Sequence, residues 1–212
     1  MTLGRKQVNI LAVLSQKGGT GKSTLVRSLA VAGILDKRKV AIIDADPQGT
    51  VVAWGKRREH TVPYIVALGS STIASQVEAL KGRGANLVII DTPPHAQPII
   101  NMAAEAATGC LIVTGAFLEE LETVATVANI AKALKKPSAI VLNRVTRNHA
   151  LTLARAALAT FQLPVCPTAM AQLVPHAYAS AEGETANERE PEGKAALEVL
   201  AVYRYLKKEG LV

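Results

Sequence analysis

The chain has 212 residues, enough for one domain with a substantial buried core, and we expect a single domain over residues 1–212. Hydrophobic residues make up 49% and aromatic residues only 3%, so the core must be mainly aliphatic, and this composition excludes a disordered chain. Lysine and arginine outnumber aspartate and glutamate by 24 to 17, which allows binding to nucleic acid or anionic lipid, and no apolar segment is long enough to span a membrane.

Predicted strands and helices alternate along the chain. The segment "VNILAVL" is an apolar, β-branched strand that leads into a glycine-rich loop. Such alternation predicts an α/β fold with three layers: a mostly parallel twisted sheet with helices on both faces. In chain order we expect a strand at 8–14, a helix at 21–37, strands at 39–46 and 61–68, a helix at 71–82, strands at 86–94 and 109–116, a helix at 118–136, a strand at 138–145, a helix at 148–161, a strand at 163–170, an acidic surface loop at 180–193 and a helix at 194–210.

The segment "SQKGGTGKST" (15–24) has the character of a phosphate-binding loop. It departs from the usual pattern G-x-x-x-x-G-K-[ST], because Gln16 stands where the first glycine would be and Lys17 is an extra lysine. Glycines let successive N–H groups point at phosphate oxygens, Lys22 adds a charge near the β- and γ-phosphates, and the Ser23 hydroxyl can ligate Mg²⁺. The residues expected to contact nucleotide here are Lys17, Gly18, Gly19, Thr20, Gly21, Lys22, Ser23 and Thr24.

Three aspartates follow predicted strands. Asp91 ends "LVIID", where an apolar strand delivers a carboxylate to the water shell of a metal ion. Asp44 and Asp46 in "DADPQG" lie two residues apart, so one can support the metal shell while the other orients an attacking water. Turn or helix-capping roles before Pro47 are the alternative. Because the carboxyl ends of parallel strands share one edge of a sheet, the loop and these aspartates should meet there.

Together, "KGGTGKST", "DADPQG" and "VIIDTPP", in this order and spacing, resemble the ParA/MinD family of deviant Walker A ATPases over essentially the whole chain. The resemblance implies a Mg²⁺-dependent ATPase that binds ATP and forms an ATP-sandwiched homodimer. It implies that Lys17 touches the phosphates of the partner subunit's ATP, whereas Lys22 serves the ATP in its own pocket. By the same resemblance Asp46 positions the hydrolytic water, and Asn143 in "VLNRV" contacts adenine unless it only ends a strand before a turn.

Within that family the chain is most similar to the small ParA partition proteins. Only seven residues precede the first strand, so we expect no additional helix-turn-helix domain, and Trp54 after "DPQG" points the same way. The resemblance implies a cytoplasmic, nucleoid-associated ATPase that binds double-stranded DNA non-specifically as the ATP dimer. A ParB-type partner would stimulate hydrolysis, so that a plasmid or chromosome is segregated. Positioning of a protein organelle such as a carboxysome, or a MinD-like membrane-recruited regulator, are the alternatives.

Basic residues late in the chain are the candidates for DNA contact. The chain has few aromatic residues, which favours contact with a duplex backbone over stacking on single strands. A solvated basic surface is the alternative for each residue. The candidates are Arg144, Arg147 and Arg155 around the sixth strand and the helix after it, with Lys207 and Lys208 at the C-terminal tip.

Other proteins of related fold are less consistent with this sequence. A MinD-like role needs a C-terminal helix that inserts into lipid, whereas we expect the helix at 194–210 to pack on the sheet. Cys110 and Cys166 lie in apolar stretches, which predicts buried thiols in a reducing cytoplasm and not the cluster ligands of a nitrogenase-type iron protein. A ligase like dethiobiotin synthetase would not explain Lys17. The acidic segment "AFLEELETVAT" (116–126) departs from the family, so its dimer interface is expected to differ.

Overall fold

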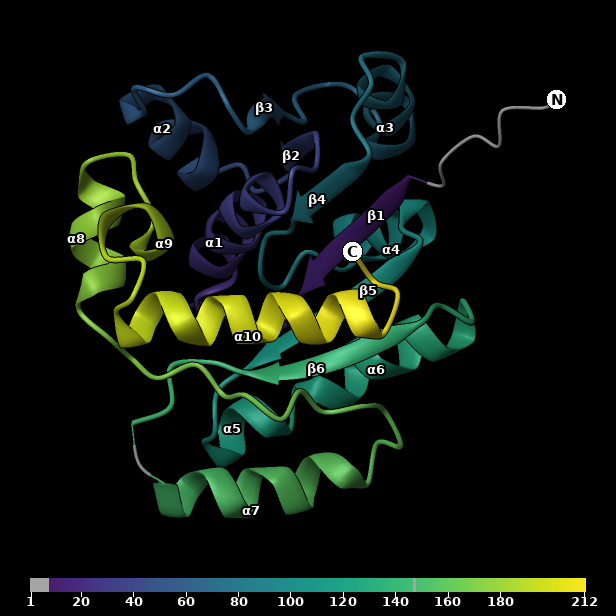
Figure 1. The fold of residues 1–212 in the computed structure, drawn as a ribbon. Coiled ribbons are helices and arrows are strands. Elements are labelled where there is room, and N and C mark those ends of the chain that lie inside the picture. Colours follow the sequence, from purple (N-terminus) through teal and green to yellow (C-terminus); the bar gives the residue numbers. More distant parts are fainter. Residues whose placement is uncertain (1–7, 147) are drawn as a thin grey trace, which may run out of the picture.

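The computed structural model describes residues 8–146 and 148–212. Its centre is a six-stranded sheet in which all neighbouring strands run parallel, in the order β3-β2-β4-β1-β5-β6 (Figure 1). This confirms the predicted α/β class and the parallel sheet. The strands are β1 (Asn9–Leu14), β2 (Val40–Asp44), β3 (Tyr64–Ala67), β4 (Leu87–Asp91), β5 (Gly109–Thr114) and β6 (Ser138–Leu142).

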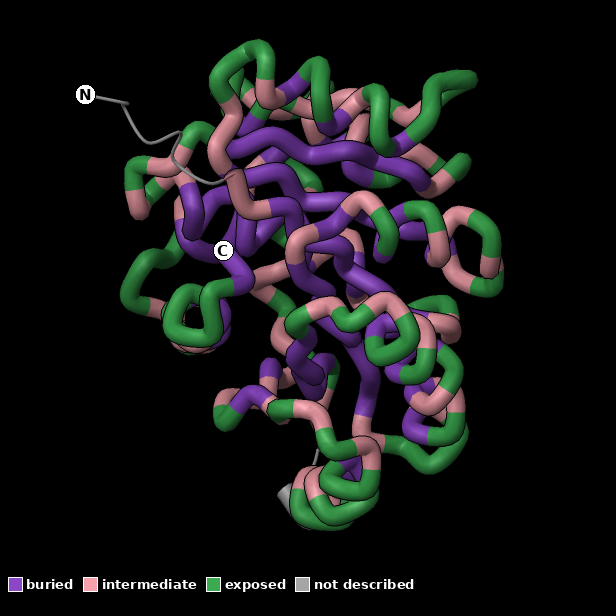
Figure 2. Tube along the Cα trace, turned by 90° about the vertical axis from the view of Figure 1, so that its right-hand side faces the viewer, coloured by how far each residue is buried: buried purple, intermediate pink, exposed green. Residues whose placement is uncertain are grey.

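Helices cover both faces of the sheet, so the central strands are buried on both sides and read as continuous apolar runs. Alternate residues of β1 serve the two faces: Ile10 and Ala12 face one apolar cluster, whereas Leu11 and Val13 face the other. Figure 2 shows the buried trace running through the middle of the molecule, with exposed segments at its periphery. The two layers of helix therefore enclose two separate cores.

The first face is covered by α1 (Lys22–Leu35), α2 (Thr50–Arg57) and α10 (Lys194–Lys208), beside which the short helices α8 (Pro175–Ala181) and α9 (Ala186–Arg189) pack. Within the described residues, none of the helices combines the length and apolar character needed to cross a membrane. The opposite face is covered by α3 (Ile73–Gly82), α4 (Gln97–Ala106), α5 (Leu118–Leu121), α6 (Val124–Ala133) and α7 (Asn148–Ala159).

One predicted strand is wrong. The segment 163–170 forms no strand; it meets β6 through isolated parallel bridges, Ile140 with Val165 and Val145 with Ala171. Pro164 and Pro167 remove two backbone donors from this segment, and a ladder needs those donors. The sheet accordingly has six strands where the sequence predicted seven.

Several helices also differ from the prediction. The expected helix at 118–136 is interrupted at Glu122 and Thr123, which separates α5 from α6. The segment 180–193, expected as a surface loop with at most a short turn of helix, contains the four-residue α9, but its Thr185 and Asn187 are buried and not at the surface. The helices α2, α4 and α8 were not predicted. They are short, α2 is rich in β-branched residues, and α4 and α8 have a proline in the first turn, a position that accommodates it. Cys110 and Cys166 are buried free thiols, as predicted.

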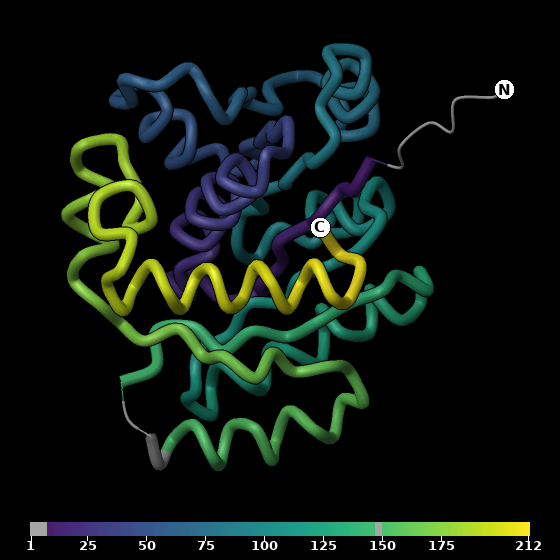
Figure 3. The backbone as a smooth tube through the Cα atoms, in the orientation of Figure 1, coloured from purple at the N-terminus to yellow at the C-terminus, as the bar shows by residue number. Residues whose placement is uncertain are grey.

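The parallel sheet has two chemically different edges, which we call the carboxyl edge and the amino edge after the strand ends that lie there. The glycine-rich loop leaves β1 at the carboxyl edge, and α1 then runs back towards the amino edge (Figure 3). The 14 residues of α1 span about 21 Å. The chain ends at the amino edge, where the Asn9 side chain donates a hydrogen bond to the Gly210 carbonyl at 3.3 Å.

Candidate nucleotide-binding site

The glycine-rich loop turns sharply between β1 and α1. Gly19 and Gly21 have φ angles of 76° and 82°, in the left-handed region that side chains disfavour. A Cβ on Gly21 would lie 2.5 Å from the Asn143 amide nitrogen, so a side chain at this position would displace Asn143 from its bond to the Thr20 carbonyl. Because α1 begins at the next residue, its unpaired N–H groups and its positive end face the same side as the loop.

A cavity of about 380 Å³ lies over this loop. Its walls come from four different strand-end loops, which confirms that the loop and Asp46 meet at the carboxyl edge. The adjoining segment after β4 is fixed to the loop, because the His95 N–H donates to the Gln16 carbonyl at 3.1 Å. The lining residues are Gly18, Gly19, Thr20, Gly21, Lys22, Ser23, Thr24, Arg27, Asp46, Thr50, Pro94 and Arg144.

The two lysines of the loop are placed differently. The Lys22 side chain lies in the cavity wall and is 6% exposed, and its Nζ lies 3.5 Å from the Lys17 carbonyl oxygen. Burial lowers the pKa of Lys22, and the Asp91 and Asp46 carboxylates act in the opposite direction. Lys17 does not line the cavity, and its ammonium makes no ion pair with any residue that the structure describes.

Asp91 is fully buried at the end of β4. No donor in the described part of the chain satisfies hydrogen-bond geometry to either of its carboxylate oxygens. Burial raises the pKa of Asp91 to about 7, although the nearby Ser23 hydroxyl and Lys22 ammonium favour the ionised form. Buried oxygens without a partner are what a hard cation such as Mg²⁺ would satisfy.

The two aspartates of "DADPQG" make different contacts. Asp44 caps α2: its carboxylate accepts the N–H groups of Val51 and Val52, each at 2.9 Å, and that of Asp46 at 3.2 Å. This geometry supports the helix-capping alternative and does not support the predicted metal-shell role of Asp44. Asp46 instead lines the cavity, with one carboxylate oxygen accepting the Gln48 N–H at 2.9 Å.

A larger cavity of about 740 Å³ adjoins the first one, and Asn143 lies in its wall. The Asn143 amide nitrogen donates to the Thr20 carbonyl at 2.8 Å, so this side chain braces the glycine-rich loop. Its predicted contact with adenine stays a prediction. His176, which the sequence did not single out, also lines this cavity, and its buried Nε2 has no hydrogen-bond partner among the described residues.

Of the five predicted DNA-binding residues, the four that the structure describes do not form one patch. Arg144 lies at the carboxyl edge, where its guanidinium bonds the Gly19 carbonyl. The Arg155 guanidinium bonds the carbonyls of Cys166 and Pro167 at 3.2 and 2.6 Å. Lys207 pairs with Asp36 at the amino edge, 2.7 Å away, and Lys208 is its exposed neighbour. Arg147 lies outside the described residues. The predicted patch is therefore split between both ends of the sheet.

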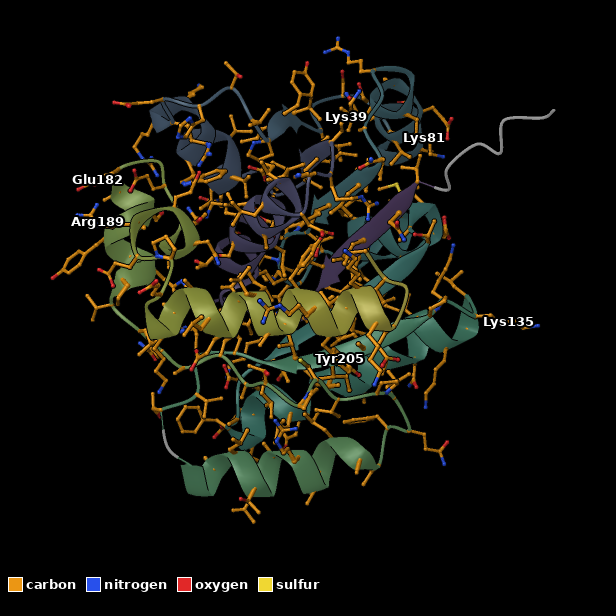
Figure 4. All side chains as sticks on the ribbon, in the orientation of Figure 1. Lys39, Lys81, Lys135, Glu182, Arg189 and Tyr205 are labelled. Atoms are coloured by element: carbon orange, nitrogen blue, oxygen red, sulfur yellow. The ribbon has the colours of Figure 1, made fainter. Side chains whose placement is uncertain are left out.

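The amino edge carries a larger group of cations, which includes Lys207 and Lys208 and which we call the amino-edge basic surface. Figure 4 labels two of them, Lys39 and Lys81, on the side of the molecule where β1 and β4 begin, opposite Glu182 and Arg189. They come from the ends of α1, α3 and α10 and from the start of β2. The surface consists of Lys37, Arg38, Lys39, Lys81, Arg83, Lys207 and Lys208.

A metal ion at the carboxyl edge would find few protein ligands. No group of three or more histidine, cysteine, aspartate or glutamate side chains in residues 8–146 and 148–212 is arranged to hold a metal. Mg²⁺ bound beside phosphates needs only one or two protein ligands, because water and phosphate oxygens supply the others. The Ser23 hydroxyl and the unpartnered Asp91 carboxylate fit that requirement.

Comparisons with known proteins point to one family. Residues 11–185 match the CobQ/CobB/MinD/ParA nucleotide binding domain. The chain is 38% identical over 86 residues to the maintenance of carboxysome distribution protein A of Gloeobacter kilaueensis, covering 40% of this chain and 38% of that protein. It is 29% identical over 150 residues to the chromosome-partitioning ATPase Soj of Thermus thermophilus, covering 57% of this chain and 60% of that protein. These two alignments thus span less than two thirds of the relatives' length.

A third relative aligns almost from end to end. The maintenance of carboxysome distribution protein A of Halothiobacillus neapolitanus is 28% identical over 199 residues, covering 88% of this chain and 90% of that protein. Among solved structures, the MinC:MinD cell division complex of Aquifex aeolicus has a TM-score of 0.79 at 17% identity, covering 95% of this chain and 96% of the other. MinD of Pyrococcus horikoshii complexed with Mg-ADP has a TM-score of 0.78 at 19% identity, covering 96% and 98%. The structural likeness concerns the fold.

Proposed function

Since this chain belongs to the CobQ/CobB/MinD/ParA family of nucleotide-binding domains, we propose that it is an ATPase that binds ATP with Mg²⁺ at the glycine-rich loop. Support comes from the cavity over the loop, from Lys22 and Ser23 in its wall, and from the unpartnered carboxylate of Asp91. The cavity's position at the end of β1 is the usual ligand site of open parallel sheets.

The observation that carries the proposal furthest is the different placement of the two loop lysines. Lys22 lines the cavity of its own chain, whereas Lys17 does not. A lysine beside a phosphate site but outside it is available to the nucleotide of another subunit. We therefore assign Lys17 to the ATP of a second copy, in a homodimer that closes over two nucleotides. ATP would then hold the dimer together, and hydrolysis would loosen it.

The chain's own residues have distinct roles in hydrolysis. The loop N–H groups and Lys22 would hold the β- and γ-phosphates, and Ser23 and Asp91 would hold Mg²⁺. The ion would supply positive charge beside the phosphate oxygens. One oxygen of Asp46 is fixed by the Gln48 N–H, while the other has no partner in the described chain and is free to orient the attacking water. Lys17 of the second subunit adds charge where it develops during the reaction.

The cargo is proposed from the relatives and from the basic surface. Soj is named a chromosome-partitioning ATPase, which favours DNA segregation with a ParB-type partner. The net charge of +7 and the amino-edge basic surface suit non-specific binding to a DNA backbone, and hence association with the nucleoid. Positioning of a protein organelle is the second candidate, favoured by the end-to-end alignment with a carboxysome distribution protein.

The structure gives less support to a MinD-like membrane role. The apolar face of α10 is used within the fold, because Val199, Val202 and Leu206 are fully buried against the sheet. This helix therefore has no free apolar face to insert into lipid. Sedimentation with anionic liposomes in the presence of ATP separates the two classes: co-sedimentation would favour the membrane role over the DNA role.

Light scattering with ATP and Mg²⁺ tests the ATPase dimer directly. We expect Lys17→Ala to bind ATP with near wild-type affinity and to remain a monomer. Lys22→Ala should lose ATP binding and therefore dimerisation as well. An ATP-dependent dimer of Lys17→Ala would contradict the role in the partner's site, and undiminished ATP affinity of Lys22→Ala would contradict the assignment of the loop.

A further inference from the structure

Arg27 is a buried guanidinium beside the nucleotide cavity that the mechanism above does not use. It lies one helical turn after Ser23 on α1 and is 6% exposed. Its Nε donates to the Ser23 carbonyl at 3.1 Å, and its two terminal nitrogens donate to Thr24 Oγ1 at 3.0 Å and to Ser180 Oγ at 2.7 Å. All three acceptors are neutral.

Within the described residues, this cation lacks a counter-ion. No carboxylate in the described part of the chain lies within ion-pairing distance of Arg27. A guanidinium carries five N–H groups, and three hydrogen bonds leave two of them unused. Buried charges are normally paired, because an unpaired one is costly to hold away from water. Arg27 therefore has an uncompensated positive charge and two unused N–H donors with which it can bind an anion from outside the described chain.

The position of Arg27 indicates which part of a nucleotide it would meet. Lys22, Ser23 and Asp46 line only the smaller cavity, whereas Asn143 and His176 line only the larger one. Arg27 lines both, together with Gly21, Thr24 and Arg144. If the smaller cavity takes the terminal phosphates, the junction takes the α-phosphate and the sugar, which ATP and ADP share.

We propose that Arg27 is a nucleotide-binding residue that bonds the α-phosphate and sugar, and so strengthens the binding of ATP and ADP equally. The inference rests on the proposed nucleotide site. An interaction present in the substrate, the transition state and the product lowers KM without raising kcat. Arg27 would thus set how tightly the protein retains the nucleotide after hydrolysis. Lys17 and Asp46 would instead act in the steps that need ATP, which are dimerisation and hydrolysis.

The surroundings of Arg27 supply both a readout and a matched control. Its Cζ lies 5.8 Å from the ring centre of the buried Trp54, which is the only tryptophan in the sequence. The Arg58 guanidinium also lies over that ring, at 4.4 Å, but it bonds Glu188 and lines neither cavity. Arg58 therefore shares the packing role of Arg27 around Trp54 and not its place in the site.

The experiment measures dissociation constants for ATP and for ADP by tryptophan fluorescence and by calorimetry. The variants are Arg27→Gln, Arg27→Lys and Arg58→Gln. We expect Arg27→Gln to weaken both nucleotides about 10- to 100-fold, the range for a lost charge-assisted hydrogen bond, and to raise KM with kcat kept at saturating ATP. Arg27→Lys keeps the charge but not the several N–H donors of the planar guanidinium, so it should lose less nucleotide affinity. Arg58→Gln should bind both nucleotides as wild type does.

Three results would overturn the inference: wild-type constants in Arg27→Gln, a loss confined to ATP, or equal losses in Arg27→Gln and Arg58→Gln. If Arg27→Gln does not fold, the same dissociation constants are compared between Arg27→Lys and Arg58→Gln, and equal affinities in the two would overturn the inference. Failure of the proposed function looks different, because the wild-type protein itself would then bind neither ATP nor ADP.

Discussion

The two edges of the sheet differ in whether their charged side chains are buried and whether they have partners. At the carboxyl edge Lys22, Arg27 and Asp91 are buried, and the carboxylate of Asp91 has no hydrogen-bond partner in residues 8–146 and 148–212. At the amino edge charges are exposed or satisfied: Lys207 pairs with Asp36 at 2.7 Å, and Arg38 bonds the side chains of Asn9 and Asn86.

This difference indicates where the chain is built for a ligand. Buried charges without partners cost stability, and a fold keeps them only where something else compensates. Mg²⁺ and a nucleotide would do so at the carboxyl edge. Among the residues that the structure describes, the amino edge shows no such deficit, so we expect it to contribute through the long-range attraction of an exposed basic surface, which salt weakens. The two edges should consequently respond differently to the same kind of substitution.

The largest effect is expected from Asp46→Ala at the carboxyl edge. Loss of the carboxylate that orients water should reduce the ATP turnover rate about 100-fold or more, while ATP affinity stays within a few-fold of wild type. Single-turnover hydrolysis and equilibrium binding, measured on the same preparation, separate the two quantities. Wild-type turnover in the variant would show that another group orients the water.

The amino edge should show the converse behaviour. Lys39 and Lys208 are exposed and lie far from the nucleotide cavity. Their double replacement by alanine should lower the slope of log DNA affinity against log salt by about two units, one for each phosphate contact, with ATP affinity unchanged. Filter binding across a salt series with ATP measures this.

The control for the DNA experiment is Arg155→Ala, because the Arg155 guanidinium is engaged by the carbonyls of Cys166 and Pro167. We expect this variant to keep the wild-type salt slope. If Arg155→Ala lowers the slope and the double variant does not, the DNA surface lies along α7 and not at the amino edge.

Removing one carboxylate charge at each edge should change the free energy of unfolding in opposite directions. Asp91→Asn removes a buried, unpartnered charge and should raise the free energy of unfolding of the nucleotide-free protein by roughly 1–3 kcal/mol, while it impairs hydrolysis. Asp36→Asn removes the partner of Lys207 and should lower that free energy by about 0.5 kcal/mol. Thermal unfolding without Mg²⁺ measures both. A lower melting temperature for Asp91→Asn would mean that a donor within the chain satisfies Asp91.

The carboxyl edge was easier to predict from the sequence than the basic residues elsewhere. The glycine-rich loop and Asp46 were predictable, because a glycine turn after an apolar strand and an aspartate at a strand end are local patterns whose place follows from a parallel sheet. The basic patch was not predictable. The sequence grouped Arg144, Arg155 and Lys207 by charge alone, whereas each side chain is held by a partner from a distant segment. Arg27 was missed for a related reason: on a buried helix face it has no motif, and only the two cavities reveal its position.

The last prediction concerns a charge pair that belongs to neither edge, and it tests whether unsatisfied charge is confined to the nucleotide site. Glu188 bonds Arg58 at 2.7 Å and the Thr185 N–H at 2.8 Å. Burial alone would raise the pKa of Glu188, but the bonds from Arg58 and Thr185 outweigh it, so the pKa lies below its ordinary value. A lowered folded-state pKa adds stability above the unfolded-state pKa, and this stability is lost as pH falls through the folded-state value. Glu188→Gln should therefore cost about 1 kcal/mol at pH 7 and progressively less below about pH 4.5. Chemical denaturation of both proteins across pH measures the gap; a gap that widens as pH falls would place Glu188 with the unsatisfied charges of the carboxyl edge.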